Sequence, residues 1–356
     1  MSSRHTILVI NPGSTSTKVA VFEDETLLKE TVARHTRHEL DACKSVAGQM
    51  NLRLNIVERF LEKAGISLDA LSAVVGRGGL VEPIDSGTYT VNEAMLRDLQ
   101  ATASEHAASL GGIIASVIGE RAGIPAFVVD PVVVDEMDQY AKLTGLPGIE
   151  RRSVFHALNQ KAVARRCAKD MGVLYENSRF IVAHMGGGIT VGAHRYGRVI
   201  DVNDALSGEG PFTPERSGSV PAAELIRLCY SGAFTEQEML DKVSKSGGMQ
   251  AYLGTNDLRK CERLIKEGDA YAALVLESMA YQVSKEIGAM VAVLEGRVDA
   301  IILTGGLTYS DRFTGCIKQR VSLIAPIMVY PGEDEMLSLA LGALRVLRGE
   351  RKAIEY

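Results

Sequence analysis

Short apolar runs joined by turns of small residues open the chain and predict a β-meander. Residues 6–10 and 19–22 are compact apolar runs, and residues 27–32 alternate weakly between apolar and polar side chains. Runs of this length are typical of strands. The first turn, NPGSTSTK at residues 11–18, therefore joins two strands, unlike the strand-to-helix turn of a P-loop. It also departs from that motif in its letters, because Thr17 stands where the motif needs a glycine.

The same pattern returns about half a chain later. Residues 179–202, RFIVAHMGGGITVGAHRYGRVIDV, contain an apolar strand, a turn of three glycines, a second strand, a turn at Tyr196 and Gly197, and a third strand. This separation is far longer than the period of a solenoid repeat. The recurrence therefore predicts a duplicated domain.

Helical patterns and buried strands fill the rest of each half. The helices are expected at residues 41–64, 93–120 with a break near Gly111–Gly112, 153–171, from a capping box of Thr235 and Glu238 onward, and 269–294. Short β-rich runs at residues 126–130 and 299–304 are typical of strands buried in mixed or parallel sheets. We therefore predict two α/β domains, each a mixed sheet flanked by helices, with a ligand in the cleft between them.

Length and charge support this picture and exclude several partners. A chain of 356 residues favours two domains. Its 39 basic and 44 acidic side chains are spread out and give a net charge of −5, which argues against nucleic acid. No apolar run approaches the ~20 residues of a membrane helix, and the polar N-terminus lacks a signal-peptide pattern. Five scattered cysteines without metal or redox spacing complete the expectation of a cytoplasmic protein without a membrane partner.

Three turns of small residues are candidates for binding an anion. The first is the hairpin turn at residues 11–18, the second is the glycine turn at residues 186–188, and the third is Gly305–Gly306 between a buried strand and a helix. Backbone N–H groups in such turns favour anions, and glycine lets a ligand approach closely. One such turn is weak evidence. The order hairpin, hairpin, then strand–Gly–Gly–helix is a much more specific combination.

This order resembles the superfamily of sugar kinases, heat-shock ATPases and actin. The resemblance implies the duplicated two-domain actin-like ATPase (ribonuclease-H-like) fold with the nucleotide in the interdomain cleft. One hairpin of each domain would hold the phosphates of ATP, and the glycine turn would hold adenosine. It also implies a first domain at residues 1–150, joined by a C-terminal helix at 337–356, and a second domain at 151–336 with the adenosine-binding region.

Four further strings resemble the acetate and butyrate kinase family: RRSVFHALNQ (151–160), FTPERSG (212–218), GTNDLR (254–259) and YPGEDEMLSLALGA (330–343). The tripeptide RGG at 77–79 and the string YPGEDE point to the butyrate kinase branch. The resemblance implies that butyrate and ATP are converted reversibly to butyryl phosphate and ADP. Isobutyrate, or acetate and propionate, remain alternative substrates, because one sequence constrains the volume of an acyl pocket poorly.

The resemblance also implies catalytic roles. Arg216 matches the catalytic arginine, and His156 matches a histidine that donates to the transferring phosphoryl group. Arginine suits this chemistry because its fork of donors fits carboxylate and phosphate, and phosphoryl transfer relies on positioning and charge neutralisation. Arg77 is expected to clamp the substrate carboxylate, although the family's arginine position holds Val74 here. Asp130 and Asn11 complete the catalytic set.

Other residues are expected to bind nucleotide, acid and metal. The nucleotide set comprises Ser14, Thr15, Ser16, His184, Gly186, Gly187, Gly188, Asp257, Arg259, Gly305 and Gly306. The acid set comprises Arg77, Gly76, His106 and Phe155, with Gly76 enlarging the acyl pocket. Mg²⁺, which takes few protein ligands, is expected at Asp130 and at Glu333 or Glu335, and the resemblance leaves open which acid of 333–335 serves it.

Plainer interpretations stand beside these. His156 alone on an amphipathic helix would more often be a structural histidine, and Asp130 could merely cap a turn. We read His35 and His38 as a solvated surface and Lys18 as non-catalytic. A competing class is an actin-like ATP-binding regulator without an acyl acceptor. Homo-oligomers are common in the family, so assembly into a homo-oligomer is expected.

Overall fold

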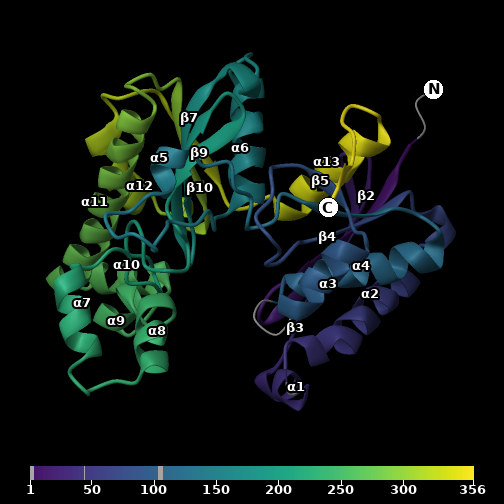
Figure 1. Ribbon diagram of the computed structural model, residues 1–356, viewed down its shortest axis with the longest axis horizontal. Helices are drawn as coiled ribbons and strands as arrows, with labels where there is room; N and C mark the ends of the chain where they lie inside the picture. The colour runs from purple at the N-terminus through teal and green to yellow at the C-terminus, as the bar shows by residue number, and fades with distance from the viewer. Residues whose placement is uncertain (1–3, 44, 103–106) are drawn as a thin grey trace. The chain divides into compact units, whose positions relative to one another are not determined.

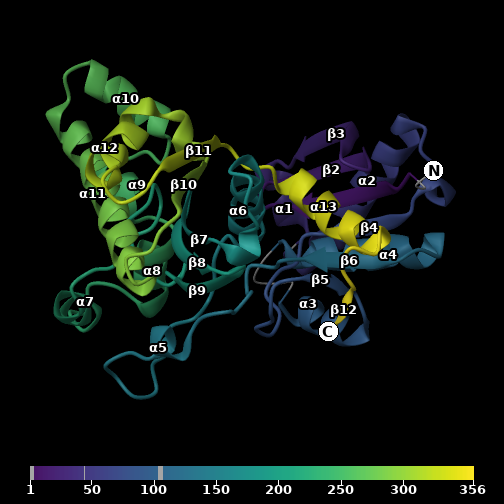
Figure 2. The same ribbon diagram turned by 90° about the horizontal axis from the view of Figure 1, so that it is seen from above.

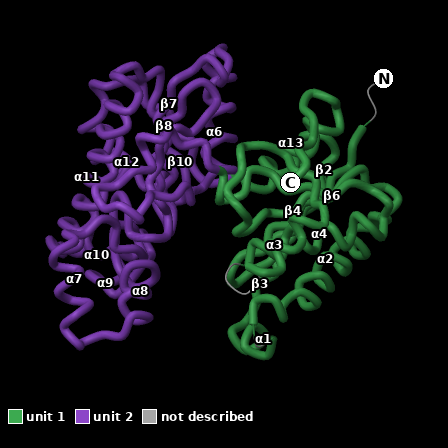
Figure 3. Tube along the Cα trace, in the orientation of Figure 1, with its two compact units in different colours: residues 1–134, 334–356 green, residues 135–333 purple. Residues whose placement is uncertain are grey.

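A computed structural model describes residues 4–43, 45–102 and 107–356 (Figure 1). The chain forms two compact units, one of residues 1–134 with 334–356 and one of residues 135–333 (Figure 3). The boundaries differ from the predicted ones, chiefly because residues 135–150 belong to the second unit. There Glu136 accepts a hydrogen bond from the buried Lys161 at 2.7 Å, and the Asp138 N–H donates to the Ile200 carbonyl.

The first unit is built on a seven-stranded mixed sheet in the order β12-β5-β6-β4-β1-β2-β3. Its strands are β1 (Thr6–Pro12), β2 (Ser16–Glu23), β3 (Thr26–Arg34), β4 (Ala73–Gly76), β5 (Thr88–Thr90), β6 (Ala126–Val129) and β12 (Ile354–Glu355). The meander β1–β2–β3 is antiparallel, whereas β4 runs parallel to β1 and β6 runs parallel to β4. The carboxyl ends of β1, β4 and β6 therefore meet at one edge of the sheet.

Helices cover both faces of this sheet. They are α1 (Arg37–Ala42), α2 (Met50–Ala64), α3 (Glu93–Thr102), α4 (Ser109–Ala122) and α13 (Glu335–Leu347), with 3-10 turns η1 (Ala47–Gln49) and η2 (Leu68–Ala70). Leu8 and Ile10 of β1 pack in one core cluster with Val57 of α2 and Ile114 of α4. Helix α13 contacts β1, β4 and β6. Figure 1 shows α2, α3 and α4 together on one side and α13 on the other.

The second unit repeats this plan with five strands in the order β11-β10-β7-β8-β9. They are β7 (Arg179–Met185), β8 (Ile189–Arg195), β9 (Arg198–Val202), β10 (Ala300–Gly305) and β11 (Ile327–Pro331). Again an antiparallel meander, β7–β8–β9, is extended by parallel strands, here β10 beside β7 and β11 beside β10. The recurrence seen in the sequence is thus a recurrence of topology, and the fold is the predicted duplicated actin-like fold.

Alternating side chains of β7 pack on helices on both faces of this sheet. Phe180 and Val182 pack with α6, whereas Ile181 and Ala183 pack with α11 and α12. Figures 1 and 2 show α6 on one side and α11 with α12 on the other. The helices are α5 (Gln139–Lys142), α6 (Ala157–Asp170), α7 (Ala222–Cys229), α8 (Glu236–Ser244), α9 (Gly248–Leu253), α10 (Leu258–Lys266), α11 (Ala270–Val293) and α12 (Asp311–Val321), with 3-10 turns η3 (Tyr175–Asn177) and η4 (Gly306–Tyr309).

The predicted helix break at Gly111–Gly112 is wrong. Both glycines lie inside α4, and the preceding helix already ends at Thr102. A Cβ on Gly111 would lie 2.4 Å from the Arg77 carbonyl oxygen, and one on Gly112 would lie 2.6 Å from a Leu99 methyl. The glycines therefore allow α4 to pack closely on its neighbours. Among the described residues, no helix is long and apolar enough to cross a membrane.

Candidate active site

Three predicted residues of the first unit gather at the carboxyl edge of its parallel strands. Asn11 lies near the end of β1, Arg77 directly follows β4, and Asp130 directly follows β6. The register places Ile10 beside Gly76 and Gly76 beside Val128, so Asn11, Arg77 and, one residue further along, Asp130 emerge at the same edge. In open α/β sheets this edge is where ligands bind.

Glu335, at the start of α13, joins two of these residues. Its Oε2 accepts a hydrogen bond from Asn11 Nδ2 at 2.8 Å, and its Oε1 forms an ion pair with Arg77 Nη1. The side chains of Arg77 and Glu335 are 18% and 11% exposed, so the pair is largely shielded from water. Both carboxylate oxygens are thus bonded to protein groups. Glu335 therefore positions Asn11 and Arg77, and its role as a metal ligand stays a prediction.

The backbone of Asp130 is in a conformation that residues other than glycine rarely adopt. Its φ is 38°, and the residue is only 3% exposed. Its Oδ1 accepts hydrogen bonds from Ser86 Oγ at 2.6 Å and from the Gly87 N–H at 2.9 Å. A left-handed backbone at an aspartate costs free energy, and such strain clusters at functional sites.

Gly76 has a packing role that was not predicted. A Cβ there would lie 2.1 Å from the Gly111 carbonyl oxygen. The space beside Gly76 is thus occupied by the backbone of α4, and the glycine allows this helix to contact β4. Its effect on an acyl pocket stays a prediction. His106, predicted to bind the acid, lies outside the described residues.

The first hairpin turn presents hydroxyls to solvent. Ser14 and Thr15 are exposed and Ser16 is half-buried, while Thr17 is fully buried. Lys18 is also exposed. His35 does not belong to a solvated surface as predicted, because it is only half-exposed and its Nε2 lies 2.8 Å from Thr17 Oγ1.

In the second unit, the three glycines of the β7–β8 turn each face different side chains. A Cβ on Gly186 would lie 3.4 Å from Glu333 Oε1 and 3.5 Å from His184 Nε2. One on Gly187 would lie 3.6 Å from Glu215 Oε2.

Gly188 is the most closely approached of the three glycines. A Cβ there would lie 2.1 Å from Arg216 Nη1 and 3.4 Å from His156 Cε1. The two residues predicted to act on the phosphoryl group therefore meet at one glycine of the predicted phosphate turn.

The guanidinium of Arg216 is positioned by backbone groups. Its Nη1 donates to the Ala205 carbonyl at 2.6 Å, and the backbone N–H of Arg216 donates to Thr213 Oγ1. The Thr213 hydroxyl in turn donates to the Gly187 carbonyl at 2.7 Å, which ties the arginine's turn to the glycine turn. Burial lowers the pKa of Arg216, although Glu215 and Asp204 act in the opposite direction.

One buried nitrogen of this cluster, Arg216 Nε, has no hydrogen-bond partner in the described part of the chain. The buried His184 Nε2 lies 3.2 Å from Glu333 Oε1, and His184 Nδ1 lies 2.8 Å from Asn159 Oδ1. Buried polar groups are nearly always satisfied, so exceptions need an explanation.

His156 occupies the N-cap position of α6 without a side-chain capping hydrogen bond, and its ring stacks on His184, with ring centroids 3.8 Å apart and planes 14° apart. Its Nδ1 lies 2.9 Å from Thr190 Oγ1. The Gln160 amide nitrogen donates to both the Thr190 carbonyl and the Thr190 hydroxyl oxygen, at 3.1 and 2.8 Å. The Thr190 hydroxyl can donate to His156 Nδ1 or accept from it, depending on the tautomer of the imidazole. In the tautomer that accepts at Nδ1, His156 carries its proton on Nε2 and can donate from there.

The network continues behind Gln160. The amide oxygen of Gln160 accepts from His194 Nε2 at 3.0 Å, and Tyr175 lies 2.8 Å from His194 Nδ1. Burial lowers the pKa of His194 well below its usual value, which keeps this ring neutral. Sequence reasoning missed Gln160 and Thr190. The spacing of four between His156 and Gln160 was the available signal, because it places both on one helix face.

The predicted adenosine residues lie apart from these contacts. Gly305 has a φ of 93°, and a Cβ there would lie 2.4 Å from the Met185 carbonyl oxygen, so glycine is required. Gly306 faces open space. Asp257 caps α10 by accepting from the Arg259 N–H, and it also pairs with the Arg259 guanidinium at 2.9 Å. Asp257 therefore has a structural function as a helix cap, and the role of the pair in nucleotide binding stays a prediction.

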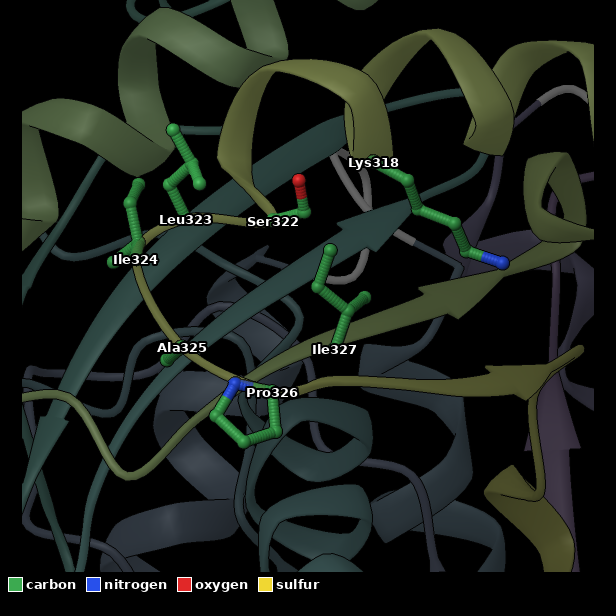
Figure 4. Close-up of a pocket in the computed structure, with 7 residues that line it drawn as sticks. All are labelled: Lys318, Ser322, Leu323, Ile324, Ala325, Pro326 and Ile327. Carbon is green, nitrogen blue, oxygen red and sulfur yellow. The ribbon is translucent and has the colours of Figure 1, made fainter.

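Two further observations concern apolar space. Phe155, predicted to line the acyl pocket, is 1% exposed. A surface pocket of about 660 Å³ is lined by Lys318, Ser322, Leu323, Ile324, Ala325, Pro326 and Ile327 (Figure 4). It lies where β11 begins, so it is at the opposite edge of the sheet from Gly188 and His184. None of the predicted site residues lines it.

We expect Gly188→Ala to lower kcat by about 100-fold, because a misplacement of about 1 Å costs this much. The new methyl group would displace the Arg216 guanidinium, whereas the backbone of Gly188 is not in the left-handed region. Gly187→Ala is the matched variant, since its methyl meets no atom closer than 3.6 Å. Steady-state kinetics of both variants, with thermal unfolding to check the fold, measure the difference. Equal losses in the two variants would contradict the assigned contact.

Comparisons with known proteins agree on a single family. The model of the acetokinase family matches residues 138–313. Butyrate kinase 2 of Clostridium acetobutylicum is 52% identical over 351 residues, covering 98% of this chain and 99% of that protein.

Solved structures agree with the fold. Acetate kinase of Porphyromonas gingivalis has a TM-score of 0.79 at 20% identity, covering 96% of this chain and all of that one. A propionate kinase from Francisella tularensis has a TM-score of 0.77 at 20% identity, covering 95% of this chain and 98% of that one. At this level of identity the likeness shows the fold alone.

Proposed function

Because the chain belongs to the acetokinase family, we propose that it transfers the γ-phosphoryl group of ATP to the carboxylate of butyrate, giving ADP and butyryl phosphate. The nucleotide pair ATP and ADP follows from membership of a kinase family. Butyrate is chosen over other short acids because the 52% identical relative is a butyrate kinase.

One observation carries the proposal. Arg216 and His156 both approach Gly188, in a turn whose counterpart in the first unit is also a hairpin with small residues. A guanidinium with a buried, unbonded Nε can bind an anion. In its Nε2-protonated tautomer, the imidazole of His156 can donate to a phosphoryl oxygen. Donors fixed in place before reaction stabilise developing charge without reorganisation.

The first unit would hold the acid and orient it. Among the described residues, Glu335 is the bonded partner of the Arg77 side chain, through Nη1 alone. The other nitrogens of the guanidinium can therefore receive the carboxylate of butyrate. Asn11, fixed by the same glutamate at 2.8 Å, lies at the same strand edge and can donate to a phosphate oxygen.

Mg²⁺ is part of this proposal. The described residues contain no group of three or more side chains that could cage a metal ion. This suits Mg²⁺, which keeps several waters and binds through one or two carboxylates plus substrate phosphates. Asp130 and Glu333 are the acids that fit, Glu333 because it faces Gly186 of the glycine turn. Bound at either acid, the ion would neutralise phosphate charge. A cytoplasmic location and assembly into a homo-oligomer also remain proposals, on the strength of the family resemblance.

A series of carboxylic acids tests the choice of substrate. Acyl phosphate formed with Mg-ATP is trapped with hydroxylamine, using straight and branched acids of two to five carbons. We expect the highest kcat/KM for butyrate, with a decrease of about tenfold for each one or two methylenes removed or added, since one methylene is worth ~1–3 kcal/mol in a pocket. A maximum at isobutyrate, propionate or acetate would keep the chemistry and replace the substrate.

A further inference from the structure

A fully buried arginine lies beneath the first hairpin turn. Arg53 sits in the first turns of α2 and has an exposed fraction of 0%. Its Nη1 donates to the Ser16 carbonyl at 2.8 Å, and its Nη2 donates to the Gly13 carbonyl at 2.8 Å. The guanidinium therefore contacts the inner side of the turn on which Ser14 and Thr15 are exposed.

All donors of Arg53 are used, and every acceptor is neutral. Nη1 also donates to Thr17 Oγ1 at 3.0 Å. The Gln49 Oε1 atom accepts from both Nε and Nη2, at 3.2 and 2.7 Å. Five hydrogen bonds thus fix the guanidinium without any carboxylate.

In the part of the chain that the structure describes, Arg53 forms no salt bridge with a carboxylate. The Cys43 thiol is the titratable group that raises the pKa of Arg53, against the larger effect of burial. Burial lowers its pKa, but an arginine stays protonated in proteins. His35, the nearby titratable group on Thr17, adds no negative charge, and burial followed by Arg53 itself lowers its pKa. Burying a cation without a negatively charged partner costs free energy, so the presence of Arg53 at this buried position needs an explanation.

We propose that Arg53 is a positioning residue that raises the affinity of the 13–16 turn for phosphate. Its counter-charge is the phosphate chain of a nucleotide bound on the outer side of that turn. This inference rests on the proposed function in taking the ligand to be a nucleotide. It adds a residue that touches no ligand and acts through the turn.

Two physical effects of Arg53 favour an anion at this turn. The positive charge acts across the thickness of one turn through protein rather than water, where screening is weak. The guanidinium also holds the carbonyls of Gly13 and Ser16 inward, and the His35 N–H holds the Thr15 carbonyl at 2.9 Å. Carbonyl oxygens that would repel phosphate are therefore directed away from the exposed surface.

Gln49→Glu tests the proposal with almost no change of shape. A glutamate at position 49 can accept the same two hydrogen bonds and supplies the missing negative charge beside Arg53. We expect the thermal midpoint to rise, because a buried cation gains a partner, while the Kd for ADP rises about tenfold. The Kd for adenosine, which has no phosphate, is expected to stay unchanged. Isothermal titration calorimetry with ADP and adenosine measures both.

Gln100→Glu, an exposed position on α3, is the control for one added charge on the same unit. Its Kd for ADP is expected to equal that of the unsubstituted chain. A Gln49→Glu variant with a raised thermal midpoint and unchanged ADP affinity would overturn the proposal and leave Arg53 a purely structural residue.

A second variant decides the matter if Gln49→Glu is destabilised. Arg53→Met removes the charge and retains most of the length, and we expect it to lose ADP affinity relative to adenosine. Equal affinity ratios in Arg53→Met and the unsubstituted chain would overturn the proposal. These readouts need no acyl transfer, so a chain that binds ADP but makes no acyl phosphate would refute the proposed function and still test Arg53.

Discussion

Replacing Arg216 by alanine is expected to lower kcat by about 10³-fold or more, because an arginine that neutralises transferring phosphate is worth 10³–10⁵. That range corresponds to at least ~4 kcal/mol of transition-state stabilisation. The guanidinium lies against Gly188 and has a buried Nε without a partner in the described residues, so its main interaction is expected with substrate. Steady-state kinetics with saturating ATP and butyrate give the value.

The fold of the Arg216→Ala variant is expected to persist. The arginine side chain bonds the Ala205 carbonyl, whereas the turn itself is held by the Thr213 hydroxyl. Arg216→Lys keeps the charge and loses the fork, so we expect it to recover only a small part of the activity. A kcat within tenfold of normal for Arg216→Ala would remove this residue from the mechanism.

Replacing His156 by alanine is expected to lower kcat by about 10²–10³-fold, the usual effect of removing one fixed donor to a developing charge. KM for ATP should change little, because the histidine is assigned to the transition state rather than to ground-state binding. The stacked position of its ring on His184 and its contact with Gly188 are the basis of this expectation. A defect confined to KM for ATP would move His156 to nucleotide binding.

Thr190→Val tests whether the hydrogen-bond network behind His156 affects kcat by positioning the His156 ring. The isosteric change removes the hydroxyl that is hydrogen-bonded to His156 Nδ1 at 2.9 Å. In the presence of His156 it should lower kcat, and in the His156→Ala background it should have no further effect. Thr314→Val removes a comparable buried hydroxyl that donates only to backbone carbonyls of its own helix, and serves as the matched control.

The architecture was predictable because its signals are local and occur twice. The strands at 6–10 and 19–22 are compact apolar runs joined by a turn of small residues. The same arrangement recurs in the two strands that flank the glycine turn at 186–188. Helix ends at Gly65 and the capping box of Thr235 with Glu238 are likewise fixed by neighbouring residues. Such features need no knowledge of contacts between distant segments.

The glycines of the site were harder to interpret. Gly76 was read as space for an acyl group and Gly111 as a helix break, yet each allows β4 and α4 to approach each other. In the sequence, a glycine that leaves space for a ligand looks the same as a glycine that allows two backbones to pack closely. Only the position of the opposing backbone distinguishes a pocket from a close contact.

Residues that act from behind the site gave the weakest signals. Arg53 looks like one more solvated charge on α2, although it lies four residues before Val57 and therefore on the apolar face. Glu335 was predicted only as a candidate metal ligand, and its pairing with Arg77 and Asn11 was missed, because these partners are 258 and 324 residues away. Contacts over such separations leave no pattern in a single sequence.

The most direct test of the account is acyl phosphate formation by the purified chain with Mg-ATP and butyrate, measured together with ADP release. We expect ADP and hydroxylamine-trapped butyryl phosphate in a ratio near one, and little ADP when the acid is omitted. ADP release that is equally fast without any carboxylic acid, or no acyl phosphate from any acid despite intact ADP binding, would contradict the carboxylate kinase and favour an ATP-binding regulator.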